Sequence, residues 1–448
     1  MKHRLGCYRS LAMVIGRFTL VFALFAAASS FASEGEETNA ENDLGLPVAA
    51  PESVGMSSER LERVTNAMQG YIDRREVAGV VTLIARRGKV VHLESLGYRH
   101  AEGNAPMTAD AIFRLASMTK PIASVALMML WEEGHFQLRD PISKFLPEYA
   151  EMDVATLPGE GEQVGTTYKR VAAARPITVQ HILTHTAGFP NLYRGLTRGD
   201  YLGLRAKRDG KKDGWTIDAM SRDLAQLPLN FHPGDKWEYG PATDIVGRLV
   251  EVISGKTFDQ FLKERIFAPL DMTDTHFYLP AEKVERFAAL YGPNEEGKIE
   301  LTEAPSVESR YIKEPHTYFS GAGGLVGTAR DYFRFHQMML DGGELQGVRL
   351  LGPKTVELMT TNHIGDLETW LRGPGFGFGL GYSVVTDKGL SGMPSQLGSY
   401  AWGGAFGTVF WVDPEEELIG ILMTQIRPYT HINIRRDLQT LTYQAILE

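Results

Sequence analysis

Apolar residues recur at helical spacing in several separate parts of the chain. Residues 57–75 have the pattern of an amphipathic helix. Its apolar face would be formed by Leu61, Val64, Met68, Tyr71 and Ile72. Residues 113–134 are apolar on nearly every side, which predicts a helix buried in the interior. A shorter helix is predicted at 243–254, and a last amphipathic helix closes the chain with the apolar residues Leu438, Leu441, Ile446 and Leu447.

Short apolar runs bounded by turn residues lie near both ends of the chain. Residues 80–85 and 90–93 flank Arg86-Arg87-Gly88-Lys89, which predicts a β-hairpin. Residues 409–412 and 418–423 flank a second turn, Asp413-Pro414-Glu415-Glu416. We therefore expect an α+β fold in which an antiparallel sheet is built from about 52–135 and 300–448 and is flanked by helices. The region between, about 136–299, is rich in Pro, Gly and charge and is expected to form a mostly helical insertion.

The first 32 residues have the composition of an export signal. Four cations without an acidic partner precede the apolar run FTLVFALFAAA, and Ser30-Phe31-Ala32 fits a cleavage site. The run is short for a membrane span, so we expect no stable membrane anchor once the signal is removed. Residues 33–51 are polar and acidic and predict a flexible linker. Export to a bacterial periplasm, or secretion, is the expected location, with one folded domain at 52–448.

Charge and cysteine content exclude several functions. The chain of 448 residues has a formal charge of −9, which becomes −13 without the cations of the signal. An acidic protein does not attract phosphate backbones, so a nucleic-acid partner is not expected. The single cysteine, Cys7, lies in the signal. The mature chain would therefore have no disulfide, no thiolate metal site and no cysteine nucleophile.

Several catalytic motifs are absent, and one possible metal motif is incomplete. The chain has neither the G-x-S-x-G elbow of α/β-hydrolases nor a phosphate-binding loop. His181 and His185 have the spacing of zinc ligands on a helix, but Ile182 stands where such a site needs a glutamate base. We therefore expect these histidines to serve packing or backbone hydrogen bonds, and we expect no metal and no organic cofactor.

The stretch FRLASMTKP, residues 113–121, carries the most informative chemistry. Ser117 and Lys120 are three residues apart at the start of the buried helix, and Pro121 is tolerated there only in the first turn. A serine hydroxyl needs a base to take its proton, and a desolvated lysine can be uncharged near pH 7. The helix N-terminus also offers backbone N–H groups to a developing oxyanion. Ser-x-x-Lys is common by chance, so its position at the start of this helix is what favours catalysis.

Five stretches in order over residues 52–448 carry a family resemblance. FRLASMTKP is followed by ITVQHILTHTAGF, WEYGPATDIVGRLVEVISG, FSGAGGLVGTARDYFRF and SYAWGGAFGTVFWVDPEE. Together they resemble the serine β-lactamase and penicillin-binding superfamily in its class C-related branch. Within that branch the chain is similar to the family VIII carboxylesterases, which are serine esterases on a β-lactamase fold.

The resemblance implies a role for three residues. Ser117 matches the acylated nucleophile, Lys120 its lysine partner, and Tyr239 the tyrosine that shares a proton with that lysine as a coupled base. A tyrosine suits that task only if nearby cations stabilise its phenolate, because its ordinary pKa is about 10. Asp244, five residues later, is assigned only a helix cap or an ion pair with an arginine.

Two departures from the lactamase pattern concern the substrate. The family has Tyr-x-Asn, whereas this chain has Tyr239-Gly240-Pro241 and lacks the amide. The family's Lys-Thr-Gly strand is replaced by Trp402-Gly403-Gly404, as in the esterases. We expect these three residues to contact substrate, and the N–H groups of Ser117 and Ala405 to form the oxyanion hole. Because Trp402 removes a cation, we expect neutral esters to be favoured over carboxylate-bearing lactams.

The sequence therefore predicts a serine hydrolase that cleaves small carboxylic esters with short acyl chains through an acyl-serine. The alternatives are a β-lactamase or D-amino-acid peptidase, an acyltransferase, and a catalytically inactive binding protein on the same fold. Binding homologues need none of the serine, lysine and tyrosine, and this chain keeps all three.

Overall fold

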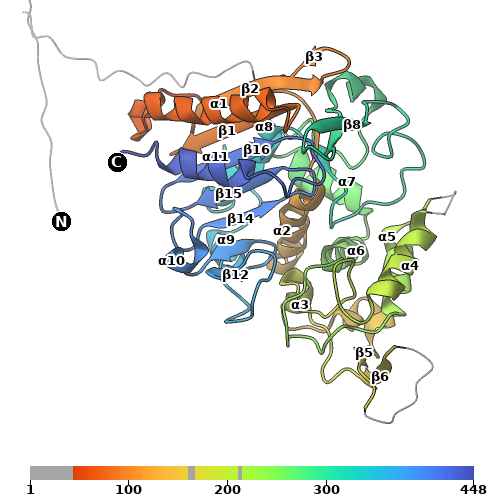
Figure 1. Cartoon of the computed structure of the whole chain (residues 1–448). Coiled ribbons are helices and arrows are strands. Elements are labelled where there is room, and N and C mark those ends of the chain that lie inside the picture. Colours follow the sequence, from red (N-terminus) through yellow and green to blue (C-terminus); the bar gives the residue numbers. More distant parts are fainter. Residues whose placement is uncertain (1–43, 160–166, 210–213) are drawn as a thin grey trace, which may run out of the picture. The chain divides into compact units, whose positions relative to one another are not determined.

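The computed structural model describes residues 44–159, 167–209 and 214–448 (Figure 1). The predicted export signal and residues 33–43 of the predicted linker lie outside the described residues. Residues 44–51 pack against the domain: Leu46 is buried, and Val90 donates its N–H to the carbonyl of Pro47 and accepts from the N–H of Ala49. The prediction of a flexible linker is therefore wrong for these eight residues, because both their backbone and an apolar side chain find partners.

An eight-stranded antiparallel sheet lies at the centre of the described fold. The strand order is β12-β13-β14-β15-β16-β1-β2-β3, so strands from both ends of the chain meet where β1 pairs with β16. The strands are β1 (Gly79–Arg86), β2 (Lys89–His100), β3 (Ala105–Pro106), β12 (Phe376–Phe378), β13 (Ser383–Val385), β14 (Tyr400–Gly403), β15 (Val409–Asp413) and β16 (Leu418–Met423). The predicted α+β class and both predicted hairpins are confirmed. The first hairpin turns through Arg87 and Gly88, which have φ angles of 50° and 72°.

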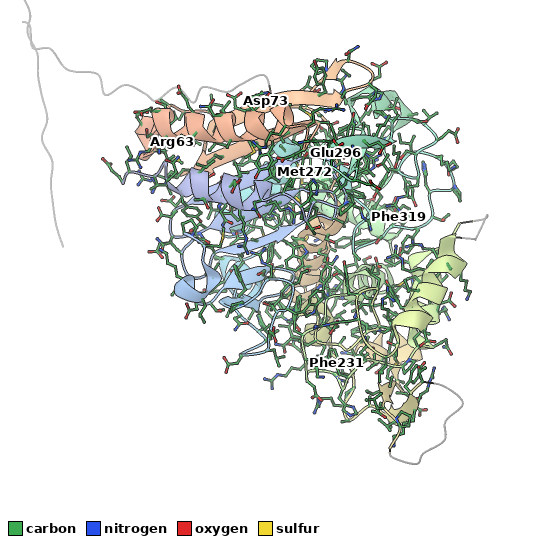
Figure 2. The ribbon with its side chains drawn as sticks, in the orientation of Figure 1. Arg63, Asp73, Phe231, Met272, Glu296 and Phe319 are labelled. Carbon is green, nitrogen blue, oxygen red and sulfur yellow. The ribbon has the colours of Figure 1, made fainter. Side chains whose placement is uncertain are left out.

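Alternation along β1 separates two hydrophobic layers. Val80 and Ile84 belong to the core under α1 (Ser58–Asp73) and α11 (Ile434–Tyr443), which lie side by side over one face of the sheet (Figure 1). Val81 and Leu83 belong to the larger core with α2 (Thr119–Glu132) and α8 (Ala329–Leu340). Arg63 and Asp73 are exposed on α1, away from its packed face (Figure 2).

The region between the two groups of sheet strands contains more strand than expected. Its helices are α3 (Val179–Leu183), α4 (Arg198–Asp209), α5 (Ile217–Ala225), α6 (Ala242–Ser254) and α7 (Phe258–Leu262). It also holds the hairpin of β5 (Asp153–Thr156) and β6 (Lys169–Ala172), and that of β7 (Leu290–Pro293) and β8 (Ile299–Glu303). The remaining elements include β4 (Phe113–Arg114), β9 (Val326–Gly327), β10 (Glu344–Leu345), β11 (Val348–Arg349), α9 (Pro353–Met359) and α10 (Lys388–Ser391).

Two predicted helices have different bounds in the structure. The helix predicted from residue 113 begins only at Thr119, because Phe113 and Arg114 pair with β9 and Ala116 has a φ of 46°, which interrupts a helix. The last helix ends at Tyr443, and Ile446 instead forms a bridge with Met56. Among the residues described here, no helix combines the length and the hydropathy that crossing a bilayer requires.

Candidate active site

Ser117 lies in a single 3₁₀ turn (Ala116–Met118) between strand β4 and helix α2. Ala116, the residue before it, has the left-handed φ of 46°, a conformation that costs free energy in any residue with a side chain. This backbone reversal ends the strand and places Ser117 at the N-terminus of α2, on the wall of a cavity. Such strain persists only where the surroundings hold it.

Hydrogen bonds on both sides hold this turn. Arg114, buried in β4, donates to Glu303 and to the carbonyl of Ala288, both at 2.7 Å. After the turn, Tyr332 of α8 donates to the carbonyl of Met118 at 2.9 Å. The hydroxyl of Thr119 accepts from the N–H of Leu325 at 3.1 Å. The nucleophile segment is thereby tied to three distant parts of the chain.

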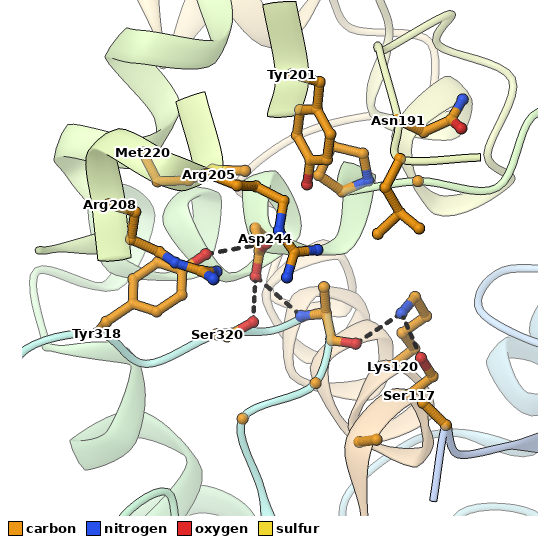
Figure 3. Close-up of a pocket in the computed structure, with 18 of the residues that line it drawn as sticks. Ser117, Lys120, Asn191, Tyr201, Arg205, Arg208, Met220, Asp244, Tyr318 and Ser320 are labelled. Atoms are coloured by element: carbon orange, nitrogen blue, oxygen red, sulfur yellow. Dashed lines mark hydrogen bonds between the residues drawn. The ribbon is translucent and has the colours of Figure 1, made fainter. Parts of the chain in front are cut away.

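Lys120, in the first turn of α2, is 3% exposed and contacts the serine directly. Its Nζ lies 3.2 Å from Ser117 Oγ and donates to the carbonyl of Ala322 at 2.6 Å (Figure 3). Burial lowers the pKa of Lys120 to about 7, and the nearby carboxylate of Asp244 opposes this shift. A large fraction of the lysine is therefore uncharged near neutral pH and is able to accept a proton.

Tyr239 approaches the same oxygen from the loop before α6. Its hydroxyl lies 2.7 Å from Ser117 Oγ, and its ring lies 4.6 Å from Lys120 Nζ. Burial raises the pKa of Tyr239 to about 12, although hydrogen bonding to Ser117 and Trp402 opposes this. The phenol is therefore protonated at neutral pH. Of the two groups in the predicted coupled base, only the lysine has a pKa near neutrality.

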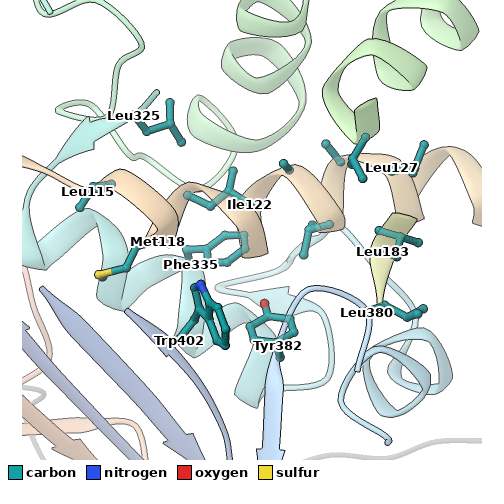
Figure 4. Close-up of a cluster of buried hydrophobic side chains, with 14 of the residues drawn as sticks. Leu115, Met118, Ile122, Leu127, Leu183, Leu325, Phe335, Leu380, Tyr382 and Trp402 are labelled. Atoms are coloured by element: carbon teal, nitrogen blue, oxygen red, sulfur yellow. The ribbon is translucent and has the colours of Figure 1, made fainter. Parts of the chain in front are cut away.

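Trp402, predicted to contact substrate, is 3% exposed and does not line the cavity. It belongs to the hydrophobic cluster with Met118 and Phe335 (Figure 4), and its ring centroid lies 5.2 Å from that of Tyr239. The prediction of substrate contact is wrong because the inner face of β14 is covered by the nucleophile segment. The indole instead supports Tyr239, including a hydrogen bond that favours its phenolate.

Gly403 and Gly404 lie against neighbouring parts of the protein rather than against the substrate cavity. A Cβ on Gly404 would collide with the carbonyl of Leu115 and the hydroxyl of Thr408, and a Cβ on Gly403 would lie 3.0 Å from Arg435 and from the carbonyl of Thr408. The absence of a side chain therefore lets the end of β14 pack directly on the segment that carries Ser117. The expectation that these glycines receive substrate is not supported.

Ala405, the next residue, does line the cavity together with Ser117. It is exposed, and no described residue accepts a hydrogen bond from its backbone N–H. This N–H is thus available beside the nucleophile, as an oxyanion hole requires. Pro241 also lines the cavity, so the amide that lactamases present at this position has no counterpart here.

Asp244 makes contacts near the site that the sequence did not indicate. It lies in the first turn of α6, is buried, and accepts hydrogen bonds from the hydroxyls of Tyr318 (3.1 Å) and Ser320 (2.7 Å) (Figure 3). It also accepts from the N–H of Ala322 at 3.0 Å. The carboxylate therefore holds the loop whose carbonyl binds Lys120. Neither predicted role, a side-chain cap or an arginine pair, matches these contacts.

The cavity has a volume of about 380 Å³ and is more cationic than expected. Besides Lys120 its wall contains Arg205, Arg208, Arg310 and Arg427, against one carboxylate, Asp244. The expected preference for neutral esters rested on the loss of a cation at position 402. That argument did not take these arginines into account, because they come from other elements.

The two histidines of the possible metal motif have separate surroundings. His181 closes a capping box with Thr178 at the start of α3, and its Nδ1 accepts from the N–H of Thr178 at 3.1 Å. His185 follows α3 with a φ of 59° and packs against Tyr239, with ring centroids 5.0 Å apart. Among the residues that the structure describes, no three His, Cys, Asp or Glu side chains are grouped to hold a metal ion.

A serine at a helix N-terminus, with a lysine and a tyrosine converging on its oxygen beside an antiparallel sheet, defines the class of serine hydrolases built on the β-lactamase fold. The model of the β-lactamase family matches residues 64–443. The chain therefore belongs to the β-lactamase family, and it is a serine hydrolase of that family.

Individual relatives are found among both bacterial sequences and solved structures. Protein Rv1367c of Mycobacterium tuberculosis is 36% identical over 363 residues, which cover 79% of this chain and 86% of the relative. Esterase EstB of Burkholderia gladioli is 30% identical over 78% of this chain and 86% of its own length. The solved structure of EstCE1, a hydrolase with promiscuous acyltransferase activity, matches with a TM-score of 0.72 and 28% identity, over 87% of this chain and 98% of that one.

Proposed function

We propose that this protein hydrolyses carboxylic esters with short acyl chains through a covalent acyl-serine at Ser117. The observation that carries the proposal is the convergence of Lys120 Nζ (3.2 Å) and Tyr239 Oη (2.7 Å) on Ser117 Oγ at the wall of the cavity. Two relatives that bear the name of an esterase or a hydrolase, EstB and EstCE1, support the same reaction class.

In the first half of the reaction, uncharged Lys120 takes the proton of Ser117 while Oγ attacks the ester carbonyl carbon. Burial lowers the pKa of this lysine to about 7, so it serves as the base near neutral pH. The carbonyl oxygen becomes an oxyanion that the N–H groups of Ser117 and Ala405 stabilise. The carbon–alkoxide bond then breaks and leaves an acyl group on Ser117.

Tyr239 carries the proton to the leaving alcohol. Its hydroxyl is protonated at neutral pH because burial raises its pKa to about 12. It therefore donates a proton to the departing alkoxide and is reprotonated from Lys120, which lies over its ring at 4.6 Å. A water molecule then attacks the acyl carbon while the same pair removes its proton. The bond from this carbon to Ser117 Oγ breaks, the pair returns the proton to Oγ, and the free acid departs.

Two features of the site favour esters over β-lactams. Pro241 offers no amide to the side chain of a lactam, and the strand residue that is a lysine in lactamases is the buried Trp402. An ester requires only the nucleophile, its base and the oxyanion hole.

A side-by-side assay of one preparation tests the proposal. The substrates are 4-nitrophenyl butyrate, a chromogenic cephalosporin and a peptide ending in D-alanyl-D-alanine, and Ser117→Ala serves as the blank. We expect a Ser117-dependent kcat/KM for the ester at least tenfold above that for either other substrate. A cephalosporin or peptide that equals the ester would replace the proposal with the corresponding alternative.

A further inference from the structure

The cations of the cavity wall come from elements that are distant in the sequence. Arg205 and Arg208 extend from α4 toward the side of the cavity where Asp244 and Ser320 lie (Figure 3). Arg427 follows β16 and also lines the cavity, and its guanidinium carbon lies 5.7 Å from the ring centroid of Phe406. Phe406 is the neighbour of Ala405, so Arg427 lies close to the expected oxyanion hole.

Arg205, Arg427 and Tyr193 line the same cavity. Burial raises the pKa of Tyr193, and the charges of Arg427 and Arg205 oppose that rise. The ring of Tyr193 in turn lies 6.1 Å from the ring of Tyr239. Positive charge from α4 and from the segment after β16 therefore acts on Tyr193, a residue of the cavity wall.

Within the described part of the chain, no carboxylate lies within 4.0 Å of the guanidinium group of Arg205 or of Arg427. The one carboxylate of the cavity wall, Asp244, already accepts three hydrogen bonds, from Tyr318, Ser320 and Ala322. A cavity wall that presents Arg205 and Arg427 beside one engaged carboxylate is suited to an anion, because a guanidinium group binds a carboxylate strongly and with defined geometry.

We propose that the natural ester carries a carboxylate group, which Arg205 and Arg427 bind while the ester carbonyl lies at Ser117. This inference rests on the proposed esterase function and narrows its substrate from neutral to anionic esters. The overall charge of −9 does not oppose this, because a bound ester meets the two guanidinium groups at short range, whereas distant surface charges are screened by salt.

Two pairs of matched esters test the proposal. Monomethyl adipate against methyl hexanoate places the carboxylate in the acyl part, and 6-acetoxyhexanoate against hexyl acetate places it in the alcohol part. Acid release is followed in a pH-stat at pH 7.5, where both carboxylates are ionised. The proteins are the wild type, Arg205→Gln, Arg427→Gln, their double variant, and Arg139→Gln, which removes an exposed arginine outside the cavity wall.

We expect the wild type to favour the anionic ester in one pair by roughly 10- to 100-fold in kcat/KM, the effect of one or two charge-assisted contacts. The ratio should fall at least fivefold in each cavity variant, fall further in the double variant, and remain unchanged in Arg139→Gln. The pair that shows the preference identifies the part of the ester that carries the charge. Ratios at or below one in both pairs, or ratios that the double variant leaves unchanged, would overturn the proposal.

A binding measurement separates this proposal from the esterase proposal. Calorimetry with Ser117→Ala needs no turnover, and we expect it to bind the anionic ester of the favoured pair at least tenfold more tightly than the neutral one. If both neutral esters are hydrolysed without any preference for charge, the anion proposal fails and the esterase proposal stands. If no ester is hydrolysed but the anionic one binds selectively, the esterase proposal fails and the anion proposal stands. Equal binding of the two esters contradicts the anion proposal whatever the turnover.

Discussion

Asp244 and Lys120 are joined through a single residue, Ala322. The backbone N–H of Ala322 donates to the carboxylate of Asp244 at 3.0 Å, and its carbonyl accepts from Lys120 Nζ at 2.6 Å. The carboxylate therefore orients the lysine through the backbone of one residue and also raises the pKa of the lysine through its charge. Asp244 is a positioning residue, because its hydrogen bonds hold the loop on which the base depends.

The pH dependence of hydrolysis should follow the ionisation of Lys120. Burial lowers the pKa of this lysine to about 7, so the uncharged, basic form becomes populated as the pH rises through that value. We expect kcat/KM for 4-nitrophenyl butyrate to rise tenfold per pH unit below about 7 and to level off above it. A profile that continues to rise to pH 10 would show that the lysine keeps its ordinary pKa of 10.5 and is not the base.

Replacing Asp244 by asparagine should move this profile in a known direction. The charge of Asp244 raises the pKa of Lys120, so its removal lowers that pKa and shifts the rising limb to lower pH. We also expect kcat to fall roughly tenfold. The single oxygen of the asparagine amide can replace only some of the three hydrogen bonds that the two carboxylate oxygens accept. Asp341→Asn, which changes an acid outside the cavity, is the control. A lower rate with an unmoved midpoint would indicate a structural role alone.

Lys120 and Tyr239 should act as one unit. Both contact Ser117 Oγ, so removing either breaks the same proton path. We predict that Lys120→Ala and Tyr239→Phe each lower kcat by roughly 10³-fold. The kcat of the double variant should be little lower than that of the less active single variant. The measurement is a complete double-mutant cycle on one ester. Losses that multiply would show that the two residues contribute independently.

The glycine at position 404 should be required for the geometry of the site. In Gly404→Ala the new methyl group would meet the carbonyl of Leu115 and the hydroxyl of Thr408, and would separate β14 from the nucleophile segment. We expect a loss of about 2–4 kcal/mol in the free energy of unfolding and at least a hundredfold lower kcat. Gly203→Ala on α4 is the control, because a Cβ there meets nothing within 4 Å. That variant should be as stable as the wild type or slightly more so.

Some of the site could be predicted from local sequence alone. Ser117 and Lys120 are three residues apart, and their contact follows from the start of a buried helix, which the apolar pattern shows. Tyr239 could be placed only through the family resemblance, since 122 residues separate it from Ser117. The sheet was predictable in outline because its hairpins have apolar runs and turn residues close together in sequence.

The rest depends on contacts between distant segments. Asp244 is defined by partners at positions 318–322, and neither stretch carries a pattern that indicates the other. Trp402 was assigned to substrate because it stands where the family has the lysine of its Lys-Thr-Gly strand. That correspondence does not show that the indole is buried against Tyr239. The cationic wall was missed because the net charge of a chain does not report which side chains surround one cavity.

The central claim is that the acyl group of the substrate becomes bonded to Ser117, and trapping that intermediate tests it most directly. The protein is mixed with an excess of 4-nitrophenyl butyrate, quenched in acid within milliseconds to seconds, and analysed by intact and peptide mass spectrometry beside Ser117→Ala. We predict an increase of about 70 Da, one butyryl group in place of one proton, which maps to the peptide containing Ser117. Lys120→Ala should reduce the rate at which it forms, and Ser117→Ala should show none of it. The same increase on another residue, or turnover by Ser117→Ala at near wild-type rate, would contradict the mechanism.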